Sequence, residues 1–278
     1  MMHLLSVIVK TEEVFNILLI LDFKVTHFSI MEKKSKKKVV LVTGGARGIG
    51  SAISLELGTS EFIVIINYNN SKEHAKSVKK DIEKNGGTAF IMKANIAKAT
   101  GCKKLFKEIE AKVGTVDILI NNAGITRDKS FKKMEIEEWN AVIDTNLSSA
   151  FNTSKLALPA MLDKKYGRII NVSSVIGQSG GFGQTNYSAA KSGLIGFSKS
   201  LAIETAKHGV TVNCICPGFI GTDMVKAMPK EVLNSIIEKI PANKLGDPKD
   251  IAKGVRYLIE ASYITGQSLN INGGLYMM

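Results

Sequence analysis

The 278-residue sequence has few residues that could support disulfide or metal chemistry. Its three cysteines, which include Cys214 and Cys216, are too few for a disulfide framework. Buried thiols in a reducing compartment are the simplest interpretation. The four histidines are scattered, whereas a metal site needs several Cys or His residues at ligand spacing. We therefore expect a cytoplasmic protein without a metal site.

The sequence also lacks a long hydrophobic run. The N-terminal stretch VFNILLIL is far shorter than the roughly 20 apolar residues that span a membrane, and acidic residues flank it. No small-residue cleavage site follows, as a signal peptide would require. Met31 then begins MEKKSKKKVVLVTGG, which reads as a normal start. We interpret residues 1–30 as an extension without function and 31–278 as the working domain, with a short membrane-surface helix at the N-terminus as the alternative.

The sequence has fewer acidic residues (25) than basic ones (37), and the formal net charge is +12. Such a charge raises the possibility of nucleic-acid binding. The lysines, however, are spread over residues 33–38, residues 72–84 and helical patterns further along, without a basic stripe carrying aromatic residues. We therefore favour a basic surface that attracts anionic substrates over one that binds nucleic acid.

Short apolar runs alternate with helical patterns from Lys38 onward. Six runs are rich in β-branched residues, as in strands buried on both faces, at residues 39–43, 62–68, 88–94, 116–122, 167–174 and 210–218. Helical patterns occur at residues 71–84, 101–113, 136–162 and 186–207. This alternation predicts a single-domain α/β fold, a Rossmann-type doubly wound parallel sheet between two helical layers. Ligands of such sheets bind beyond the carboxyl ends of the strands.

The first expected strand ends in TGGARGIG, and a helix is expected to follow. Gly44, Gly48 and Gly50 allow a tight turn in which backbone N–H groups approach a pyrophosphate at the helix N-terminus. The loop is not an ATP-binding P-loop, because Ser51 stands where that motif has lysine.

The end of the second expected strand, NYNNSK, indicates which dinucleotide would bind. NAD sites place an Asp or Glu there for the ribose 2′-hydroxyl, and this stretch has none. Arg47 and Lys72 could instead bind a 2′-phosphate through opposite charge. The sequence therefore favours NADP over NAD.

Polar residues also follow the fourth and fifth expected strands. NNAG occupies residues 121–124, and Asn146 lies in a mostly apolar helical pattern, where a buried amide needs hydrogen-bond partners. Ser173 and Ser174 end the fifth strand. Taken alone, Asn146 could bend a helix, and the serines could cap a turn or a helix.

Tyr187 and Lys191 stand four residues apart in the helical pattern NYSAAKSG and share one face. An ammonium near a phenol favours the phenolate and lowers the tyrosine pKa. Such a phenol can donate a proton to a developing alkoxide. A Y-x-x-x-K pair is common by chance, but here it follows the glycine loop, NNAG, Asn146 and Ser174. With a nicotinamide, these residues would suit carbonyl reduction.

With these motifs in order, residues 38–278 resemble the short-chain dehydrogenase/reductase family. The resemblance implies that Tyr187 is the acid/base and that Ser174 holds the substrate carbonyl. It also implies that Lys191 binds the nicotinamide ribose and lowers the pKa of Tyr187, while Asn146 anchors a proton-relay water. Asn95 stands where many members have an adenine-binding aspartate. The implied NADP(H)-binding residues are Gly44, Arg47, Gly48, Ile49, Gly50, Lys72, Asn95, Ile96, Asn122, Ala123, Gly124, Tyr187, Lys191, Pro217, Gly218, Ile220 and Thr222.

Within the family, NNAGITRD, GQSGGFGQTNYS, TDMVKA and NGGLYMM are similar to the acetoacetyl-CoA reductases of polyhydroxybutyrate synthesis. The 3-oxoacyl-[acyl carrier protein] reductases of fatty-acid synthesis share NNAGITRD and the same chemistry. The resemblance implies NADPH-dependent reduction of a 3-oxoacyl thioester, such as acetoacetyl-CoA, to the (3R)-hydroxyacyl thioester, and leaves the carrier open. The implied substrate-binding residues are Asp128, Lys133, Ser174, Phe182, Gln184 and Phe219.

The resemblance also implies a homotetramer, in which the helices expected at residues 136–162 and 186–207 would pack between subunits. The alternative to an enzyme is a non-catalytic NADP-binding protein with the same fold, which we would expect to have lost Tyr187 or Lys191.

Overall fold

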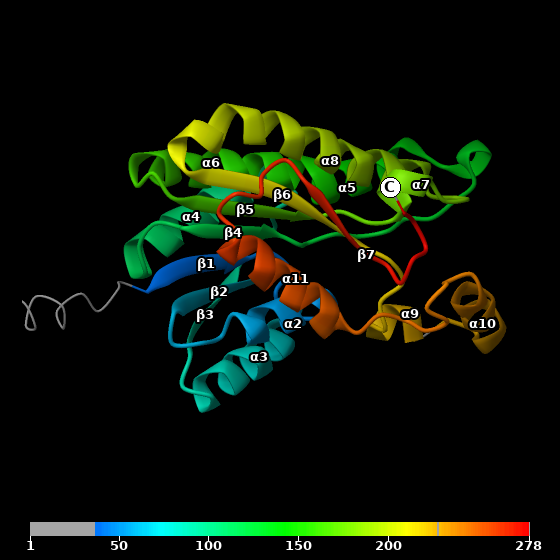
Figure 1. Ribbon diagram of the computed structural model, residues 1–278, viewed down its shortest axis with the longest axis horizontal. Helices are drawn as coiled ribbons and strands as arrows, with labels where there is room; N and C mark the ends of the chain where they lie inside the picture. The colour runs from blue at the N-terminus through cyan, green and yellow to red at the C-terminus, as the bar shows by residue number, and fades with distance from the viewer. Residues whose placement is uncertain (1–36, 227, 278) are drawn as a thin grey trace, which may run out of the picture. The chain divides into compact units, whose positions relative to one another are not determined.

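Seven parallel strands form one sheet, in the order β3-β2-β1-β4-β5-β6-β7 (Figure 1). The computed structural model describes residues 37–226 and 228–277, and Lys38–Met278 form a single unit. The expected N-terminal extension, residues 1–30, lies outside the described residues. The strand order reverses between β1 and β4, which confirms the doubly wound parallel sheet. The strands are β1 (Lys38–Val42), β2 (Phe62–Tyr68), β3 (Thr88–Lys93), β4 (Ile118–Asn121), β5 (Gly167–Val172), β6 (Val210–Pro217) and β7 (Ser268–Ile271).

The prediction of six strands missed β7. This strand is short, pairs only with β6 and is half-buried along its length, so SLNI has no continuous apolar run. Several other predictions ran past the observed strand ends. Thr43, Ser173 and Ser174 are buried just beyond β1 and β5, where they hydrogen-bond instead of continuing the strand.

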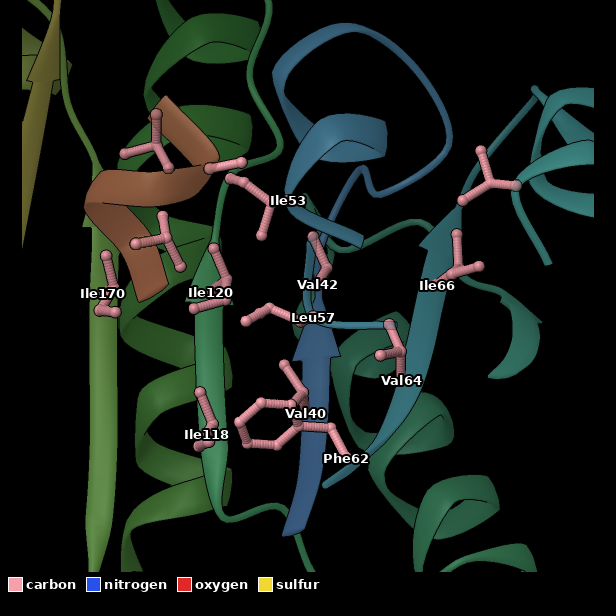
Figure 2. Packing of buried hydrophobic residues seen from close by; sticks show 14 of the residues in the cluster. Val40, Val42, Ile53, Leu57, Phe62, Val64, Ile66, Ile118, Ile120 and Ile170 are labelled. Atoms are coloured by element: carbon pink, nitrogen blue, oxygen red, sulfur yellow. The ribbon is translucent and has the colours of Figure 1, made fainter. Parts of the chain in front are cut away.

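Helices cover both faces of the sheet, and each layer has its own hydrophobic core. Val40 and Val42 face the layer of α2, α3 and α11, whereas Val39 and Leu41 face that of α4, α6 and α8. Figure 2 shows Val40, Val42 and their neighbours from β2 and β4 meeting Ile53 of α2 and Leu57, the residue that caps the C-terminus of α2. These helices are α2 (Gly48–Glu56), α3 (Lys72–Lys84), α4 (Ala99–Lys112), α6 (Ser149–Asp163), α8 (Thr185–Thr205) and α11 (Pro248–Glu260).

The helix predicted at residues 136–162 is not continuous. A π-helical turn, η2 (Asp144–Ser148), separates α5 (Ile136–Ile143) from α6. The N–H of Ser149 reaches back to the Asp144 carbonyl, and its hydroxyl donates to Thr145 O at 2.6 Å. The prediction erred because the apolar period continues across a turn that contains Asn146. The remaining elements are η1 (Phe131–Lys133), α7 (Ile176–Ser179), η3 (Ala206–His208), α9 (Asp223–Lys226) and α10 (Lys230–Glu238).

The three cysteines are free and buried, as expected. In residues 37–226 and 228–277, no helix has the length and apolar content needed to cross a bilayer. Within the same ranges, no three His, Cys, Asp or Glu side chains gather in a group that could hold a metal ion.

Candidate active site

The glycine loop between β1 and α2 is too closely packed for larger residues. Gly44 and Gly48 have φ angles of +61° and +52°, which favour glycine. A Cβ atom on Gly50 would lie 2.2 Å from Gly44 O. Arg47 is the N-cap residue of α2, and its side chain does not cap the helix. The backbone N–H groups of the first turn are therefore suited to an anionic group such as a pyrophosphate.

The NNAG segment after β4 holds this glycine loop in place. The Asn122 side chain donates to Thr43 O at 2.9 Å and to Gly44 O at 3.3 Å. In return, the Thr43 hydroxyl accepts from the N–H groups of Asn122 and Ala123, at 3.0 and 3.1 Å. These reciprocal bonds join the ends of two neighbouring strands, at the switch point where dinucleotides bind in such sheets.

Asn67 is a site residue that the sequence analysis missed. It is buried at the end of β2, and its Oδ1 accepts from Gly44 N–H at 3.4 Å. Its Nδ2 donates to the carbonyls of Met92 and Ala94, at 3.3 and 3.2 Å. Asn67 thus ties the glycine loop to β3. A polar residue inside the apolar run FIVIINY was the signal that could have identified it.

The other expected cofactor residues differ in exposure. Arg47 and Lys72 are exposed, at the starts of α2 and α3. Asn95 is exposed too, and its Oδ1 accepts from Ala97 N–H at 3.1 Å. The side chains of Ile96 and Ile220 belong to the two hydrophobic cores, so only their backbones are suited to a cofactor contact.

Thr222 lies beside the glycine loop, because a Cβ atom on Gly48 would be 3.2 Å from its Cγ2. Both residues line a cavity of about 460 Å³ with residues of α2 and the start of α11. Pro217, at the end of β6, and Gly218 come shortly before Thr222 in the chain. Gly218 has no space for a side chain, since a Cβ atom there would lie 2.8 Å from Asn272 Cα.

Gly124, Asn146 and Lys191 meet near the end of β4. A methyl group on Gly124 would lie 3.3 Å from Asn146 Oδ1 and 3.5 Å from Lys191 Nζ. Asn146 is buried, and its amide bonds the backbone of Ile125 with both of its polar atoms. The implied role of Asn146 in anchoring a water stays a prediction; the contacts seen here hold the loop after β4.

Lys191 is buried on α8 and donates from Nζ to Val172 O at 2.7 Å. Its Nζ lies 5.5 Å from the centroid of the Tyr187 ring. Burial lowers the pKa of Lys191 to about 8, and the neighbouring Cys214 and Cys216 thiol groups act in the opposite direction.

Tyr187 is half-buried and hydrogen-bonds Ser174. Burial raises the pKa of Tyr187 above its ordinary value, the bond with Ser174 lowers it, and the charge of Asp128 raises it. The net direction is the reverse of the lowering expected from Lys191. The reason is that burial of the phenol, the largest influence on this pKa, outweighs the lowering.

Ser174 lies where β5 leads into α7. Its Oγ accepts from the N–H of Ile176 at 3.1 Å. That bond uses the hydroxyl oxygen as an acceptor and leaves the hydroxyl proton of Ser174 available for donation. Ser174 and Tyr187 together can therefore offer two O–H donors to one oxygen atom.

Among the expected substrate residues, Asp128 and Gln184 lie together. Gln184 Nε2 donates to Asp128 Oδ2 at 2.9 Å. Burial raises the pKa of Asp128, and the Gln184 bond opposes the shift. Phe182 is 98% exposed, Lys133 is exposed on η1, and Phe219 is half-buried beside Ile220. Among the described residues, no hydrogen bond, ion pair or cation–π contact joins these three side chains to Ser174 or Tyr187.

A chain of buried polar side chains, also missed by the sequence analysis, lies beneath the site. Asn121 Nδ2 donates to Asn171 Oδ1 at 2.8 Å, and Asn171 Nδ2 donates to Ser198 Oγ at 2.7 Å. Thr153 Oγ1 donates to Asn121 Oδ1 at 2.7 Å. The chain connects β4, β5, α6 and α8, and so fixes the strands that carry NNAG and Ser174.

Comparisons with known proteins agree with this geometry. Residues 38–232 match the family profile described as short chain dehydrogenase. The chain is 46% identical to the 3-oxoacyl-[acyl-carrier-protein] reductase FabG of Staphylococcus aureus, over 86% of this chain and 98% of that protein. It is 43% identical to the FabG of Staphylococcus epidermidis, over 86% and 99%. It is also 46% identical to the acetoacetyl-CoA reductase of Shinella zoogloeoides, over 87% and 99%.

Proposed function

Since this chain belongs to the short-chain dehydrogenase family and is an oxidoreductase that uses a nicotinamide cofactor, we propose that it catalyses NADPH-dependent reduction of a 3-oxoacyl thioester to the (3R)-hydroxyacyl thioester. The observation that carries the proposal is the convergence of Ser174, after β5, with Tyr187 and Lys191 of α8. They lie at the edge of the sheet where the carboxyl ends of the strands meet, and the glycine loop after β1 lies at the same edge. The preferred substrate is acetoacetyl-CoA. The second candidate is the acyl-carrier-protein thioester, favoured by the names of two of the relatives.

The residues present fit NADPH. The uncapped N-terminus of α2 and a glycine loop with no room for side chains suit a pyrophosphate. Arg47 and Lys72 would bind the 2′-phosphate, and Asn95 the adenine. When bound, the nicotinamide supplies the hydride for the 3-keto carbon.

The protein's own residues would bind the carbonyl and supply the proton. Ser174 donates a hydrogen bond to the substrate oxygen with the hydroxyl proton that the Ile176 N–H leaves free. A phenol is protonated at neutral pH, and the raised pKa of Tyr187 keeps it so; Tyr187 transfers its phenol proton to the oxygen as the alkoxide develops. Lys191, fixed by Val172 O, would bind the nicotinamide ribose.

We further propose a homotetramer in which α5, α6 and α8 pack between subunits. Two large apolar side chains support this assembly: Phe151 on α6 is 49% exposed, and Ile203 on α8 is 82% exposed. Sedimentation of the full chain as a monomer at working concentration would contradict it.

The experiment that tests the function follows the loss of NADPH absorbance with the full chain. Acetoacetyl-CoA is compared with acetoacetyl-acyl carrier protein at matched concentrations, and the Tyr187→Phe variant serves as the control. A much higher kcat/KM with one thioester identifies the carrier. Full activity of Tyr187→Phe would overturn the mechanism, and tight NADPH binding without activity on either thioester would overturn the substrate assignment.

A further inference from the structure

Asn186 lies directly before Tyr187, in the first turn of α8, and is 0% exposed. Its Oδ1 accepts from Tyr187 N–H at 2.7 Å. Its Nδ2 donates to the carbonyls of Arg127 and Glu138, at 3.0 and 3.4 Å. One buried amide therefore joins the backbone of Tyr187 to the loop after β4 and to α5.

These contacts differ from those of a helix cap. Asn186 Oδ1 satisfies an N–H group of its own helix, as a cap does, but its Nδ2 donors reach residues 59 and 48 positions away in the chain. A buried amide with all of its polar groups engaged fixes the segments that it joins, because breaking a bond would leave a buried group unsatisfied.

The loop held by Asn186 also reaches the site through exposed bonds. Asp128 follows Arg127, bonds Gln184, and acts on Tyr187 through its charge. Lys129 N–H donates to Gly183 O at 2.9 Å. The Asp128–Gln184 bond is open to water, which competes with it, whereas the Asn186 amide is fully buried. Of these two side-chain bonds, to residues 127 and 128, the Asn186 bond is therefore the one better shielded from water.

We propose that Asn186 is a positioning residue for the carbonyl reduction, which holds the loop of residues 125–133 and α5 against the backbone of Tyr187. This inference rests on the proposed function, because it takes Tyr187 as the proton donor. Asn186 does not touch the reacting atoms and acts through Tyr187 and the loop.

The test compares two variants of the full chain with a matched control. Asn186→Ala removes all three bonds. Asn186→Ser keeps a hydroxyl next to Tyr187 N–H but is too short to reach Arg127 O. Asn140→Ala removes an exposed asparagine of α5 that makes no side-chain contact among the described residues. For each protein, the number of NADPH sites is counted in a fluorescence titration, and kcat is expressed per site. A variant that is partly unfolded then does not appear to have a lower kcat for that reason alone.

We expect kcat per site to fall about tenfold or more in both Asn186 variants, since a small misplacement of a reacting group is costly. The KM for NADPH should stay within about twofold, because the glycine loop is not touched. The alkaline midpoint of the pH profile should move to lower pH, since a looser loop admits water to the phenol and reduces the burial that raises its pKa. Asn140→Ala should match the wild type in all three measurements.

A value of kcat per site and a pH midpoint like those of the wild type in Asn186→Ser would overturn the proposal. Loss of NADPH binding and of the cooperative thermal transition in both variants would overturn it too, because Asn186 would then serve fold stability alone. A pH titration of the Tyr187 ring by ¹³C NMR, with Tyr187→Phe for assignment, needs no substrate. If the wild type reduces neither thioester, the proposed function fails, and this titration still decides the role of Asn186.

Discussion

Asn146 and Ile125 bond each other in both directions: Ile125 N–H donates to Asn146 Oδ1 at 2.8 Å, and Asn146 Nδ2 donates to Ile125 O at 2.9 Å. Asn146 lies in the π-helical turn between α5 and α6, and Ile125 follows Gly124 at the end of β4. The pair fixes Gly124 beside Lys191 Nζ. A π-turn is a frequent feature of functional sites, and here it places this amide in the site.

Asn146→Ala should lose both bonds and leave the backbone groups of Ile125 unsatisfied. We expect the free energy of unfolding to fall by about 1–3 kcal/mol. We also expect kcat/KM to fall by about tenfold or more, because the loop beside Lys191 loses its anchor. Urea unfolding and steady-state kinetics measure the two effects. Asn146→Asp keeps the acceptor for Ile125 N–H but loses the donor, so its free energy of unfolding and its kcat/KM should both fall by less than in Asn146→Ala. Wild-type values of both quantities in Asn146→Ala would contradict the anchoring role.

Lys191 should make the stability of the protein depend on pH in the alkaline range. Burial lowers its pKa from 10.5 to about 8. Below about pH 8, Lys191 is protonated in both the folded and the unfolded protein, and the cost of burying its charge in the folded protein is fully present. As the pH rises above it, the unfolded chain holds more protons than the folded one, so the free energy of unfolding due to Lys191 increases.

The measurement is urea unfolding of the wild type and Lys191→Met between about pH 7 and pH 10. The difference, wild type minus variant, should rise with pH by about 1–3 kcal/mol, since one unit of pKa shift corresponds to about 1.4 kcal/mol. Titrating groups that do not interact with Lys191 cancel in the difference, whereas the neighbouring Cys214 and Cys216 thiols do not. A difference that does not change with pH would show that the ammonium of Lys191 is not destabilised by burial.

The sequence predicted the sheet, and the glycine loop at the end of its first strand, because both depend on local patterns. The apolar runs of β1, β2, β4, β5 and β6 and the glycine loop need no knowledge of distant contacts. β7 was missed because its place depends on β6, and the π-turn at Asn146 because helix periodicity does not record a single extra residue. Asn67 and Asn186 form bonds to segments distant in the chain, which no local pattern shows.

The pKa of Tyr187 illustrates the same limit. The i, i+4 spacing of Tyr187 and Lys191 is local and correctly predicted their common helix face. The net direction of the shift, however, depends on how deeply the packed elements bury the phenol. That burial is a tertiary property.

Arg47 and Lys72 should decide between NADPH and NADH. Both are exposed, at the starts of α2 and α3 near the ends of β1 and β2. A charged hydrogen bond to a phosphate contributes about 1.5–3 kcal/mol, which corresponds to a factor of about 10 to 100 for each bond lost, so the double Arg47→Ala, Lys72→Ala variant should raise the KM for NADPH by about 100-fold or more. The KM for NADH, which has no 2′-phosphate, should change little.

Lys76→Ala is the matched control for this comparison. Lys76 lies on α3 like Lys72, but it pairs with Glu73 at 3.0 Å. Its removal should leave the ratio of the two KM values unchanged. If the double variant and Lys76→Ala raise both KM values equally, the effect is that of net charge, and Arg47 and Lys72 do not bind the 2′-phosphate.

Asp128 should set the alkaline limit of the reaction through its charge. Burial is the main cause of the raised pKa of Tyr187, and the carboxylate of Asp128 raises it further. Asp128→Asn keeps an oxygen that can accept from Gln184 Nε2 but removes the charge, so the pKa of Tyr187 should fall. Since Tyr187 donates only when protonated, kcat/KM should decline at a lower pH than in the wild type.

The measurement is the pH profile of kcat/KM for acetoacetyl-CoA, with Asp163→Asn as the control. Asp163 is exposed at the end of α6, and its removal changes the net charge by the same amount. A downward shift in Asp128→Asn alone assigns the effect to the carboxylate beside the phenol. Equal shifts in both variants would assign it to the overall field of the basic protein. No shift in either would mean that water screens Asp128 from Tyr187, and the Asp128–Gln184 pair would then act only by holding the loop to the start of α8.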